Sequence, residues 1–481
     1  MSDYPQLQMW IDGETVSGSM ADAIAVINPA TEETLGMLPC ATPAHLDQAL
    51  SSSARSFQHW RRLSAEERGE LLHKVARLLI ERIPHISRVL CLEQGKSIKE
   101  AAAELRYAAD IFSYCAEEGK RAYGRIIPAR TPGHRQMVFK HPIGPSLGLS
   151  PWNFPGLVPS RKIAMALAAG CTCILKASEE TPATAILTVQ ACHDAGIPPG
   201  VVNLVFGDPP TISSYLMDSE VIRKVSFTGS IPVGKHLARL ASNRLQRCTL
   251  ELGGHAPVIV MDDADPVLAA HTAAGGKFYR NAGQVCVAPT RFFVQEGVYR
   301  EFSQALAEIA QSMKVGDGRD QATDMGPLAN GRRIEAMERF VDDARRRGAS
   351  VLAGGHRIGE KGYFWAPTVL TDVDSDAQIM NEEPFGPLAP IAPFTRLDDV
   401  LTEANRLPHG LAAYAFTDSM SRAAQIAEGL DVGVVAFNHV TAAYPETPFG
   451  GVKESGDGRE GGPEGLEAFL VTRYVSEAAT A

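Results

Sequence analysis

Three residues of this sequence have the side chains needed to attack a carbonyl carbon, hold the resulting oxyanion and activate water to release the product. Cys286 ends the segment Phe278–Cys286 and offers a thiol nucleophile. Glu251 offers a carboxylate general base, and Asn153 offers a side-chain amide for an oxyanion. Each residue alone is weak evidence. Together, and with the sequences around them, they indicate a nucleophilic enzyme that acts on carbonyl compounds.

Asn153 lies in the segment Pro151–Pro155, where two prolines enclose aromatic residues. This pattern predicts a rigid loop rather than the interior of a helix or strand. An asparagine in a turn often bonds its own backbone, and for the residue taken alone that structural role is favoured. Beside a nucleophile, a rigidly held amide suits an oxyanion hole, where it works with the backbone N–H of the nucleophile.

Glu251 stands before Gly253-Gly254, so we expect it at the end of a strand that runs into a flexible turn. Such a position lets a carboxylate swing between a storage position and one that activates water.

A candidate site for a dinucleotide follows the predicted strand Lys224–Phe227, where Thr228-Gly229-Ser230 opens a helix. A helix N-terminus favours an anion such as a pyrophosphate, and Gly229 permits a tight turn. The formal G-x-G-x-x-G match at Gly456–Gly461 is rejected as a dinucleotide fingerprint. Gly462-Pro463 prevents a helix directly after it, and too little chain remains for a βαβ unit.

Lys176, Ser178 and Glu179 follow the predicted strand Cys173–Lys176, at the edge where parallel sheets bind ligands. A carboxylate there accepts from ribose hydroxyls and repels a 2′-phosphate. A purely structural role, in which the acidic residue stabilises the helix dipole, is an equally good interpretation of Glu179. Further along, Glu383 and Phe385 lie among prolines, which hold them rigidly. Glu383 could accept a hydrogen bond from a hydroxyl group, and the Phe385 ring could lie against a flat heterocycle. A helix-end salt bridge is the structural alternative for Glu383.

Two arginines are candidates for binding an anionic substrate. Arg280 precedes Cys286 by a few residues, and Arg161 is expected on the helix that leaves the Asn153 loop. A guanidinium close to a nucleophilic cysteine is expensive to desolvate unless an anion pairs with it. An internal bridge to a carboxylate is the alternative for Arg161.

Composition narrows the class of protein. A chain of 481 residues exceeds one hydrophobic core and predicts two or three domains. The net charge is −10 and the one basic run, Arg345–Arg347, suits the last turn of a helix, so no nucleic-acid partner is expected. The longest near-apolar stretch, Ile163–Leu175, is too short for a bilayer and no signal peptide is visible, so no membrane partner is expected.

The eight cysteines are scattered, with no C-x-x-C pair and no histidines at metal spacing. We therefore expect no metal site and reduced thiols, as in a cytoplasm.

The expected elements alternate between strand and helix. Ser64 and Glu67 form a capping box before a helical apolar face. From about residue 140 short β-rich runs appear, with helices between them at 184–195 and 234–245. A second series follows, with a helix at 302–313 and a strand at 432–437. The runs predicted as strands of a parallel α/β sheet are Cys173–Lys176, Val201–Phe206, Lys224–Phe227 and Ala256–Val260.

The motifs resemble, in order and spacing, the successive signatures of the aldehyde dehydrogenase superfamily, and they cover nearly the whole chain. The segments that carry this resemblance are Trp152–Pro155, Phe227–Ser230, Glu251–Gly254, Gly283–Cys286, Glu383–Pro387 and Pro448–Gly451. The resemblance implies an α/β fold with a Rossmann-type cofactor domain, an α/β catalytic domain and a small β oligomerisation arm. It also implies a homodimer or a homotetramer.

The domain bounds that the resemblance implies are 1–123 and 143–250 for the two parts of the cofactor-binding domain and 251–450 for the catalytic domain. The first part of the arm is expected at 124–142. The C-terminal segment, 451–481, is expected to add the arm's strand at Ala468–Val475.

Residue roles follow from the same resemblance. Cys286 matches the nucleophile, Glu251 the general base and Asn153 the oxyanion-hole amide, and Lys162 and Glu460 match a lysine and a second acid of a proton relay. The residues expected to bind cofactor are Ser150, Pro151, Trp152, Lys176, Ser178, Glu179, Gly229, Ser230, Gly253, Glu383 and Phe385. The residues expected to bind substrate are Arg161, Arg280, Phe154, Phe437 and Phe449.

Within the superfamily the chain resembles succinate-semialdehyde dehydrogenases, and Glu251–Pro257 with Glu460–Glu464 look closer to α-ketoglutarate-semialdehyde dehydrogenases. Two positions depart from relatives. Ala442–Glu446 lacks a serine that helps to bind the substrate carboxylate, and Ala288 replaces a second cysteine that acts as a redox lock.

The expected reaction is oxidation of a semialdehyde to a dicarboxylic acid through a thiohemiacetal and a thioester on Cys286. We expect a thiolate favoured by a helix terminus or by local positive charge. NAD is the expected cofactor because of Glu179, with NADP possible. The alternatives are a dehydrogenase for uncharged aldehydes, a cysteine hydrolase without hydride transfer, a CoA-acylating relative, which would lack the glutamate at 251, and a binding protein on a retired enzyme fold.

Overall fold

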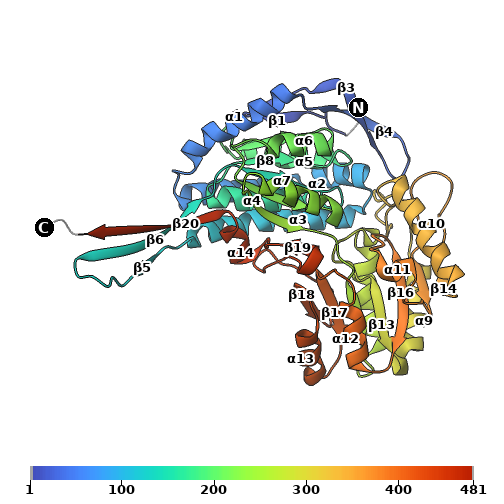
Figure 1. Cartoon of the computed structure of the whole chain (residues 1–481). Helices are drawn as coiled ribbons and strands as arrows, with labels where there is room; N and C mark the ends of the chain where they lie inside the picture. The colour runs from blue at the N-terminus through green and yellow to red at the C-terminus, as the bar shows by residue number, and fades with distance from the viewer. Residues whose placement is uncertain (1–3, 479–481) are drawn as a thin grey trace.

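The computed structural model describes residues 4–478, which form two α/β lobes and a long β arm (Figure 1). The predicted α/β class is confirmed. Each lobe contains one large sheet, and the strands predicted from the sequence are present, with bounds that match or differ by at most three residues.

The first sheet has the strand order β19-β11-β10-β7-β8-β9-β1-β2. Its five central strands are parallel, as expected for strands that alternate with helices. They are β7 (Ser146–Leu149), β8 (Cys173–Lys176), β9 (Val202–Val205), β10 (Lys224–Thr228) and β11 (Arg247–Glu251). The antiparallel edges are β1 (Met9–Ile11), β2 (Glu14–Val16) and β19 (Gly456–Asp457).

Helices cover this sheet on both faces (Figure 1). They are α1 (Pro43–Trp60), α2 (Ala65–Gln94), α3 (Ile98–Glu118), α4 (Leu157–Ala169), α5 (Pro182–Asp194), α6 (Pro209–Met217) and α7 (Ile231–Ser242). The predicted capping box before α2 is confirmed, since the Glu67 N–H donates to Ser64 Oγ and the Ser64 N–H donates to Glu67 Oε2. Helix α7 was predicted at 234–245. It starts earlier because Pro232 suits the first turn of a helix, and it ends before Leu245, whose φ is 51°.

The second sheet has the order β14-β15-β16-β13-β12-β17-β18, with all neighbours parallel except β14. Its strands are β12 (Pro257–Val260), β13 (Arg291–Gln295), β14 (Ser350–Ala353), β15 (Thr368–Thr371), β16 (Leu388–Phe394), β17 (Ala412–Phe416) and β18 (Val434–Phe437). Its helices are α8 (Pro266–Ala274), α9 (Glu296–Ser312), α10 (Gly331–Arg346), α11 (Gln378–Asn381), α12 (Leu397–Asn405) and α13 (Met420–Gly429).

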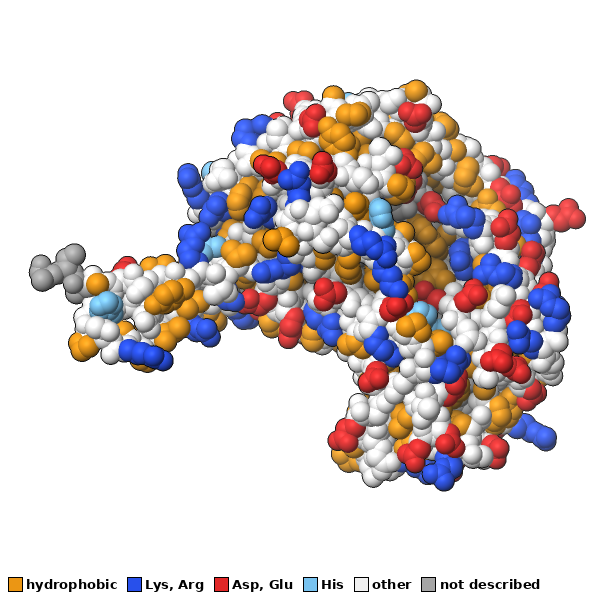
Figure 2. Space-filling model, viewed as in Figure 1, with side chains coloured by type: hydrophobic (Ala, Val, Ile, Leu, Met, Phe, Trp, Pro, Cys, Tyr) orange, Lys and Arg blue, Asp and Glu red, His pale blue; other side chains and the backbone are white. Residues whose placement is uncertain are grey.

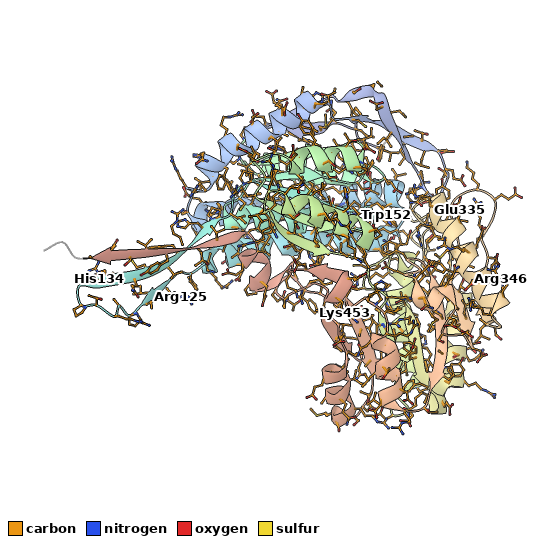
Figure 3. All side chains as sticks on the ribbon, viewed as in Figure 1. Arg125, His134, Trp152, Glu335, Arg346 and Lys453 are labelled. Atoms are coloured by element: carbon orange, nitrogen blue, oxygen red, sulfur yellow. The ribbon has the colours of Figure 1, made fainter. Side chains whose placement is uncertain are left out.

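A three-stranded arm projects from the first lobe. It pairs β20 (Leu470–Ala478) with β6 (His134–Pro142) along their whole length, and β6 with β5 (Arg125–Ile127). Hydrophobic side chains lie open on the arm in Figure 2, and Ile126 is 81% exposed. Arg125 and His134 mark the arm in Figure 3. Two further strands, β3 (Ser19–Ile27) and β4 (Thr34–Cys40), form a separate hairpin, and α14 (Gly462–Glu467) precedes β20. The prediction that no helix can directly follow Gly461 is wrong, because Pro463 suits the first turn of a helix.

Two main hydrophobic cores fill the lobes. One core runs from Tyr4 to Leu252 and is completed by Leu466, Phe469 and Leu470, whereas the other lies between Ala256 and Phe449. This separation supports the domain bounds near residue 250, which remain a prediction. None of the helices within residues 4–478 is long and apolar enough to cross a membrane.

Candidate active site

A cavity of about 1050 Å³ is lined by residues from both lobes. The first lobe contributes the loop after β7, the start of α7 and the end of β11. The second contributes the Cys286 loop, the 383–385 segment and the 440–449 loop. The predicted residues that line the cavity are Pro151, Trp152, Asn153, Phe154, Arg161, Gly229, Ser230, Glu251, Gly253, Arg280, Cys286, Glu383, Phe385, Phe449 and Glu460.

Cys286 ends a tightly folded loop. A π-helical turn at Gly275–Tyr279 is followed by a 3₁₀ turn, Asn281–Gly283, in which Asn281 and Ala282 both have φ of 50°. Left-handed backbone at such residues is strained and is found mainly at functional sites. The Gln284 side chain holds the loop, because its Nε2 donates to the Asn281 carbonyl at 3.1 Å and its Oε1 accepts from the Ala329 N–H at 2.9 Å.

The expected resting thiolate is wrong for the free enzyme. Burial, and to a smaller extent the negative charges of Glu383 and Glu251, raise the pKa of Cys286 to about 12. Arg280 and Arg161 lower this pKa but do not outweigh burial. Local positive charge is therefore present, as predicted, yet the thiol is protonated at neutral pH and needs a base or a bound cation.

Glu251 ends β11 and faces the cavity as a stored carboxyl group. It is 2% exposed, and neither carboxylate oxygen has a hydrogen-bond partner among the described residues. Its pKa lies well above the usual value because of burial, and the negative charge of Glu460 adds to this effect. A carboxylate with a raised pKa is a stronger base, which suits general-base catalysis near neutral pH.

The Asn153 side chain lies against the nucleophile loop, since its Nδ2 donates to the Gln284 carbonyl at 3.0 Å. The residue is buried, and its own backbone carbonyl accepts two further hydrogen bonds, from Lys96 and Asn281. The amide is thus a fixed donor close to the loop that ends at Cys286, as an oxyanion hole requires.

Lys162 and Glu460 form a buried ion pair behind Glu251. Lys162 Nζ donates to Glu460 Oε1 at 2.9 Å and to Thr228 Oγ1 at 2.9 Å, and Ser226 Oγ donates to the same Glu460 oxygen at 3.0 Å. Burial opposes ionisation of Glu460, but the charges of Lys162 and Arg161 and these hydrogen bonds together lower its pKa. Glu460 is therefore ionised at neutral pH, and its negative charge contributes to the raised pKa of Glu251.

Residues at the cavity fit a dinucleotide. Glu383 has a buried oxygen without a hydrogen-bond partner in the described chain, and burial raises its pKa to about 8. Its other oxygen lies 2.5 Å from the position of a Cβ added at Gly253, so a larger residue at 253 would displace the Glu383 carboxyl group. The Phe385 and Trp152 rings meet edge to face at 5.5 Å. The free oxygen of Glu383 could accept a hydrogen bond from a ribose hydroxyl, and the two aromatic rings could pack on a flat heterocycle.

The residues expected at the adenosine end of the dinucleotide site do not line the cavity. Lys176 Nζ and Glu179 Oε1 form an ion pair at 2.6 Å where β8 ends, and neither residue lines the cavity as described. Ser178 Oγ accepts from the Glu180 N–H, and Ser150 is buried with no partner for its hydroxyl within residues 4–478. These positions flank the carboxyl ends of the parallel strands.

Part of the cavity lining is basic and aromatic. Arg161 lies 4.9 Å from the centroid of the Phe449 ring, and its Nη2 donates to the Tyr107 hydroxyl at 3.2 Å. No carboxylate bridges this buried arginine in the described part of the chain, and its Nε has no hydrogen-bond partner there. Arg280 lies 5.5 Å from the Phe154 centroid. Phe437 does not line the cavity as described and packs against the second core instead.

Sequence reasoning missed several residues of the cavity. Tyr107 and Lys96 line it, and Glu100 and Glu104 come from the same helix as Tyr107. The spacing of 100, 104 and 107 places polar groups on one face of an otherwise alanine-rich helix. That pattern was the available signal, but it becomes informative only once α3 is known to face the cavity.

Comparison with known proteins agrees with this geometry. Residues 15–475 match the aldehyde dehydrogenase family. The chain is 47% identical over 468 residues to 4-(hydroxymethyl)benzenesulfonate dehydrogenase of Comamonas testosteroni, covering 97% of each protein. It is 39% identical over 468 residues to the NADP⁺-dependent succinate-semialdehyde dehydrogenase of Escherichia coli, again covering 97% of each.

A solved structure of betaine aldehyde dehydrogenase from Staphylococcus aureus, in complex with NAD⁺, superimposes with a TM-score of 0.95. The two chains are 33% identical, and the match covers 99% of this chain and 96% of the other. The protein therefore belongs to the aldehyde dehydrogenase family and is an NAD(P)-dependent oxidoreductase that oxidises aldehydes.

Proposed function

We propose that this enzyme oxidises aldehydes that carry a second, anionic group, with succinate semialdehyde and α-ketoglutarate semialdehyde as the proposed substrates. The observation that carries the proposal is the Arg161 guanidinium, which is buried beside the cavity without a carboxylate partner in the described chain. The charges of Glu460 and Glu251 act on Arg161 without forming a direct ion pair, so an anion supplied by the ligand would add the missing contact. Two of the relatives are named for substrates that bear a sulfonate or a carboxylate.

The cavity residues suggest a division of roles. The Cys286 thiol loses its proton to solvent, favoured by the positive charges of Arg280 and Arg161, and the sulfur attacks the aldehyde carbon. The Asn153 Nδ2 and the backbone N–H of Cys286 then donate to the oxyanion. When bound, NAD or NADP accepts the hydride that leaves this carbon. Glu251 next activates water to release the acid from sulfur, and Glu460 and Lys162 pass the proton onward.

Residues that would hold the cofactor are proposed from the same geometry. Glu383 would accept from the nicotinamide ribose, with Phe385 and Trp152 beside the ring and Gly229-Ser230 at the start of α7 near the pyrophosphate. Lys176 and Glu179 would bind the adenosine ribose. Because Glu179 is paired with Lys176, part of its charge is compensated and its repulsion of a 2′-phosphate is weakened.

The other candidates explain less of the cavity. A dehydrogenase for uncharged aldehydes leaves Arg161 and Arg280 without a purpose. A cysteine hydrolase leaves Glu383 and Phe385 without one, and family membership with NAD(P) use argues against it as well.

The test compares succinate semialdehyde with butanal, an uncharged aldehyde of equal chain length. Arg280→Ala should lower kcat/KM for succinate semialdehyde by about tenfold to a hundredfold, because a charge-assisted contact contributes about 1.5–3 kcal/mol. It should change the value for butanal far less. Arg300→Ala, at an exposed arginine on α9, is the control and should change neither. Equal losses on both aldehydes would refute the arginine contact.

We also propose an oligomeric state and a cellular compartment for this protein. The exposed apolar arm of β5, β6 and β20 supports a homodimer or homotetramer in which the arm packs on a second copy. All eight cysteines are free thiols, which supports a reducing compartment such as the cytoplasm.

A further inference from the structure

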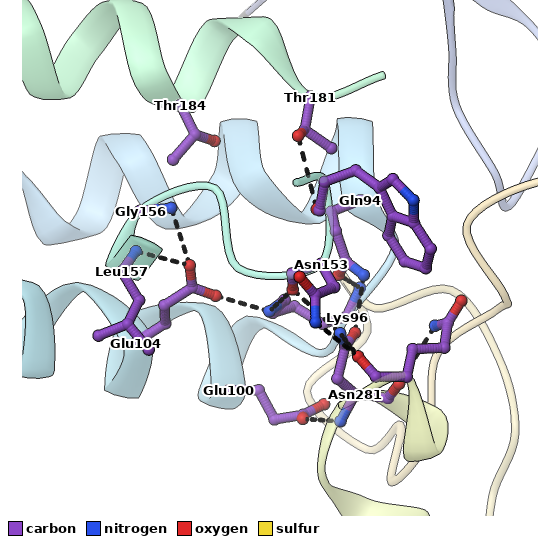
Figure 4. A network of polar contacts seen from close by, with 12 residues as sticks. Gln94, Lys96, Glu100, Glu104, Asn153, Gly156, Leu157, Thr181, Thr184 and Asn281 are labelled. Atoms are coloured by element: carbon purple, nitrogen blue, oxygen red, sulfur yellow. Dashed lines mark hydrogen bonds and ion pairs between the residues drawn. The ribbon is translucent and has the colours of Figure 1, made fainter. Parts of the chain in front are cut away.

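A buried cluster of polar side chains surrounds the loop that carries Asn153 (Figure 4). Lys96 lies between α2 and α3, Glu104 lies on α3, and Asn281 lies in the loop before Cys286. The Lys96 and Glu104 side chains are only 1% and 2% exposed, and their charges are 2.6 Å apart. A buried ion pair alone is weak evidence for stability, because desolvation offsets much of the attraction. What the pair holds in place is therefore more informative.

Lys96 holds the backbone of Asn153. Its Nζ donates to the Asn153 carbonyl at 2.9 Å and to Glu104 Oε2 at 2.6 Å, and it lies 4.1 Å from the centroid of the Phe154 ring. The same Asn153 carbonyl accepts from Asn281 Nδ2 at 3.0 Å. Two donors on one carbonyl fix the peptide plane, and with it the direction in which the Asn153 side chain leaves the backbone.

Glu104 holds the other end of the same loop. Its Oε1 accepts from the backbone N–H groups of Gly156 at 2.8 Å and Leu157 at 3.1 Å, which are the first free donors of α4. Helix α4 has no side-chain cap of its own. Glu104 therefore caps α4 from a different helix, and its negative charge suits the positive end of the helix dipole. One carboxylate thus ties Lys96 to the start of α4.

The nucleophile loop joins the same cluster. Gln94 Nε2 donates to Asn281 Oδ1 at 2.7 Å, which turns the Asn281 Nδ2 toward the Asn153 carbonyl. The Lys96 N–H donates to Gln94 Oε1 at 3.0 Å, and the Asn281 N–H donates to Glu100. The α2–α3 junction consequently contacts both loops that must be in register, the one with Asn153 and the one that ends at Cys286.

We propose that Lys96 and Glu104 are positioning residues, which hold the Asn153 amide where the oxyanion forms on substrate bound to Cys286. The inference rests on the role proposed above for Asn153. Lys96 acts through Asn153 and donates no hydrogen bond to the substrate in this account. Removing its ammonium leaves the Asn153 carbonyl with one donor and allows the peptide to rotate, and a shift on the order of 1 Å at a catalytic group can lower rates a hundredfold.

The test uses three reactions of the intact enzyme that share Cys286 but differ in their need for an oxyanion. Oxidation of succinate semialdehyde with NAD and hydrolysis of p-nitrophenyl acetate without cofactor both form one, whereas alkylation of Cys286 by iodoacetamide does not. Lys96→Met should lower kcat of the first two reactions by a similar factor, about tenfold to a hundredfold, with little change in KM. The alkylation rate should stay within about twofold of wild type.

A double-mutant cycle with Asn153→Ala separates the positioning role of Lys96 from the proposed oxyanion role of Asn153. If Lys96 acts through Asn153, Lys96→Met should have no further effect on kcat in the Asn153→Ala background. If Asn153→Ala slows both oxyanion reactions but Lys96→Met does not, the positioning proposal fails and the role of Asn153 stands. If Asn153→Ala slows neither reaction, both proposals fail.

Controls address folding. Arg291→Met removes another buried cation, which donates to the carbonyls of His255, Glu403 and Ala404 and not to the Asn153 loop. It should lower thermal stability without separating ester hydrolysis from alkylation. Should Lys96→Met fail to fold, Glu104→Gln is read in the same assays, since its amide oxygen can still cap α4 while the ion pair is lost. An equal fall in alkylation and in ester hydrolysis in these variants would overturn the proposal.

Discussion

At the scale of residues, the site combines a protonated nucleophile with a base of raised pKa. Burial raises the pKa of Cys286 to about 12 and that of Glu251 well above its usual value, while Glu460 is kept ionised by Lys162. Desolvation is the first cause for both Cys286 and Glu251, so each depends on the closed, apolar surroundings of the cavity rather than on one neighbour.

This arrangement predicts the pH dependence of alkylation. Below its pKa, the thiolate fraction of Cys286 rises about tenfold per pH unit. The rate of Cys286 alkylation by iodoacetamide in the enzyme without cofactor should therefore keep rising between pH 7 and pH 10. Mass spectrometry of the Cys286 peptide at a series of pH values measures it. A plateau below pH 8 would show that local positive charge outweighs burial.

At the scale of elements, the sequence predicted the strands well and the contacts between elements poorly. The bounds of β8 match the predicted strand, and Glu251 ends β11 as predicted, because alternation of apolar runs with glycine turns is a local signal. The contacts of Lys96 and Glu104 join α2–α3 to a loop more than 50 residues away. No local pattern encodes such contacts. The same holds for the raised pKa of Cys286, which depends on packing around it.

The arm gives a prediction at this scale. Ile126 on β5 is 81% exposed, so Ile126→Glu places a charge on the surface proposed to pack on a second copy. The variant should shift toward monomer in light scattering coupled to gel filtration. Met420→Glu is the matched control, because Met420 is 90% exposed and begins α13 in the second lobe, away from the arm (Figure 1). An unchanged mass for Ile126→Glu would place the interface elsewhere.

At the scale of the whole molecule, the cavity between the two hydrophobic cores buries ionisable groups, and this burial lowers the stability of the folded protein. Burial raises the pKa of Glu383 to about 8. An unfolded chain ionises this group above about pH 4.5, whereas the folded protein keeps it neutral until about pH 8, so stability falls with rising pH through that window. The carboxyl group is nevertheless suited to accept a hydrogen bond from a cofactor hydroxyl. Its burial therefore lowers the stability of the fold and serves cofactor binding.

Glu383→Gln should remove this pH-dependent loss. The melting temperature of the variant, relative to wild type, should rise between pH 5 and pH 8, and its affinity for NAD should fall at pH 8. Calorimetry at the two pH values checks the first result and isothermal titration the second. A melting difference that does not change with pH would contradict the buried, neutral carboxyl group.

The central claim is that oxidised substrate is held on Cys286 until Glu251 activates water. Glu251→Gln should still form about one NADH per active site with succinate semialdehyde and then stall. Intact mass spectrometry should show one added succinyl group, mapped by digestion to the peptide with Cys286, and Glu335→Gln, at an exposed glutamate on α10, should turn over normally. An NADH burst with no mass on Cys286, or an acyl group on another residue, would contradict the account.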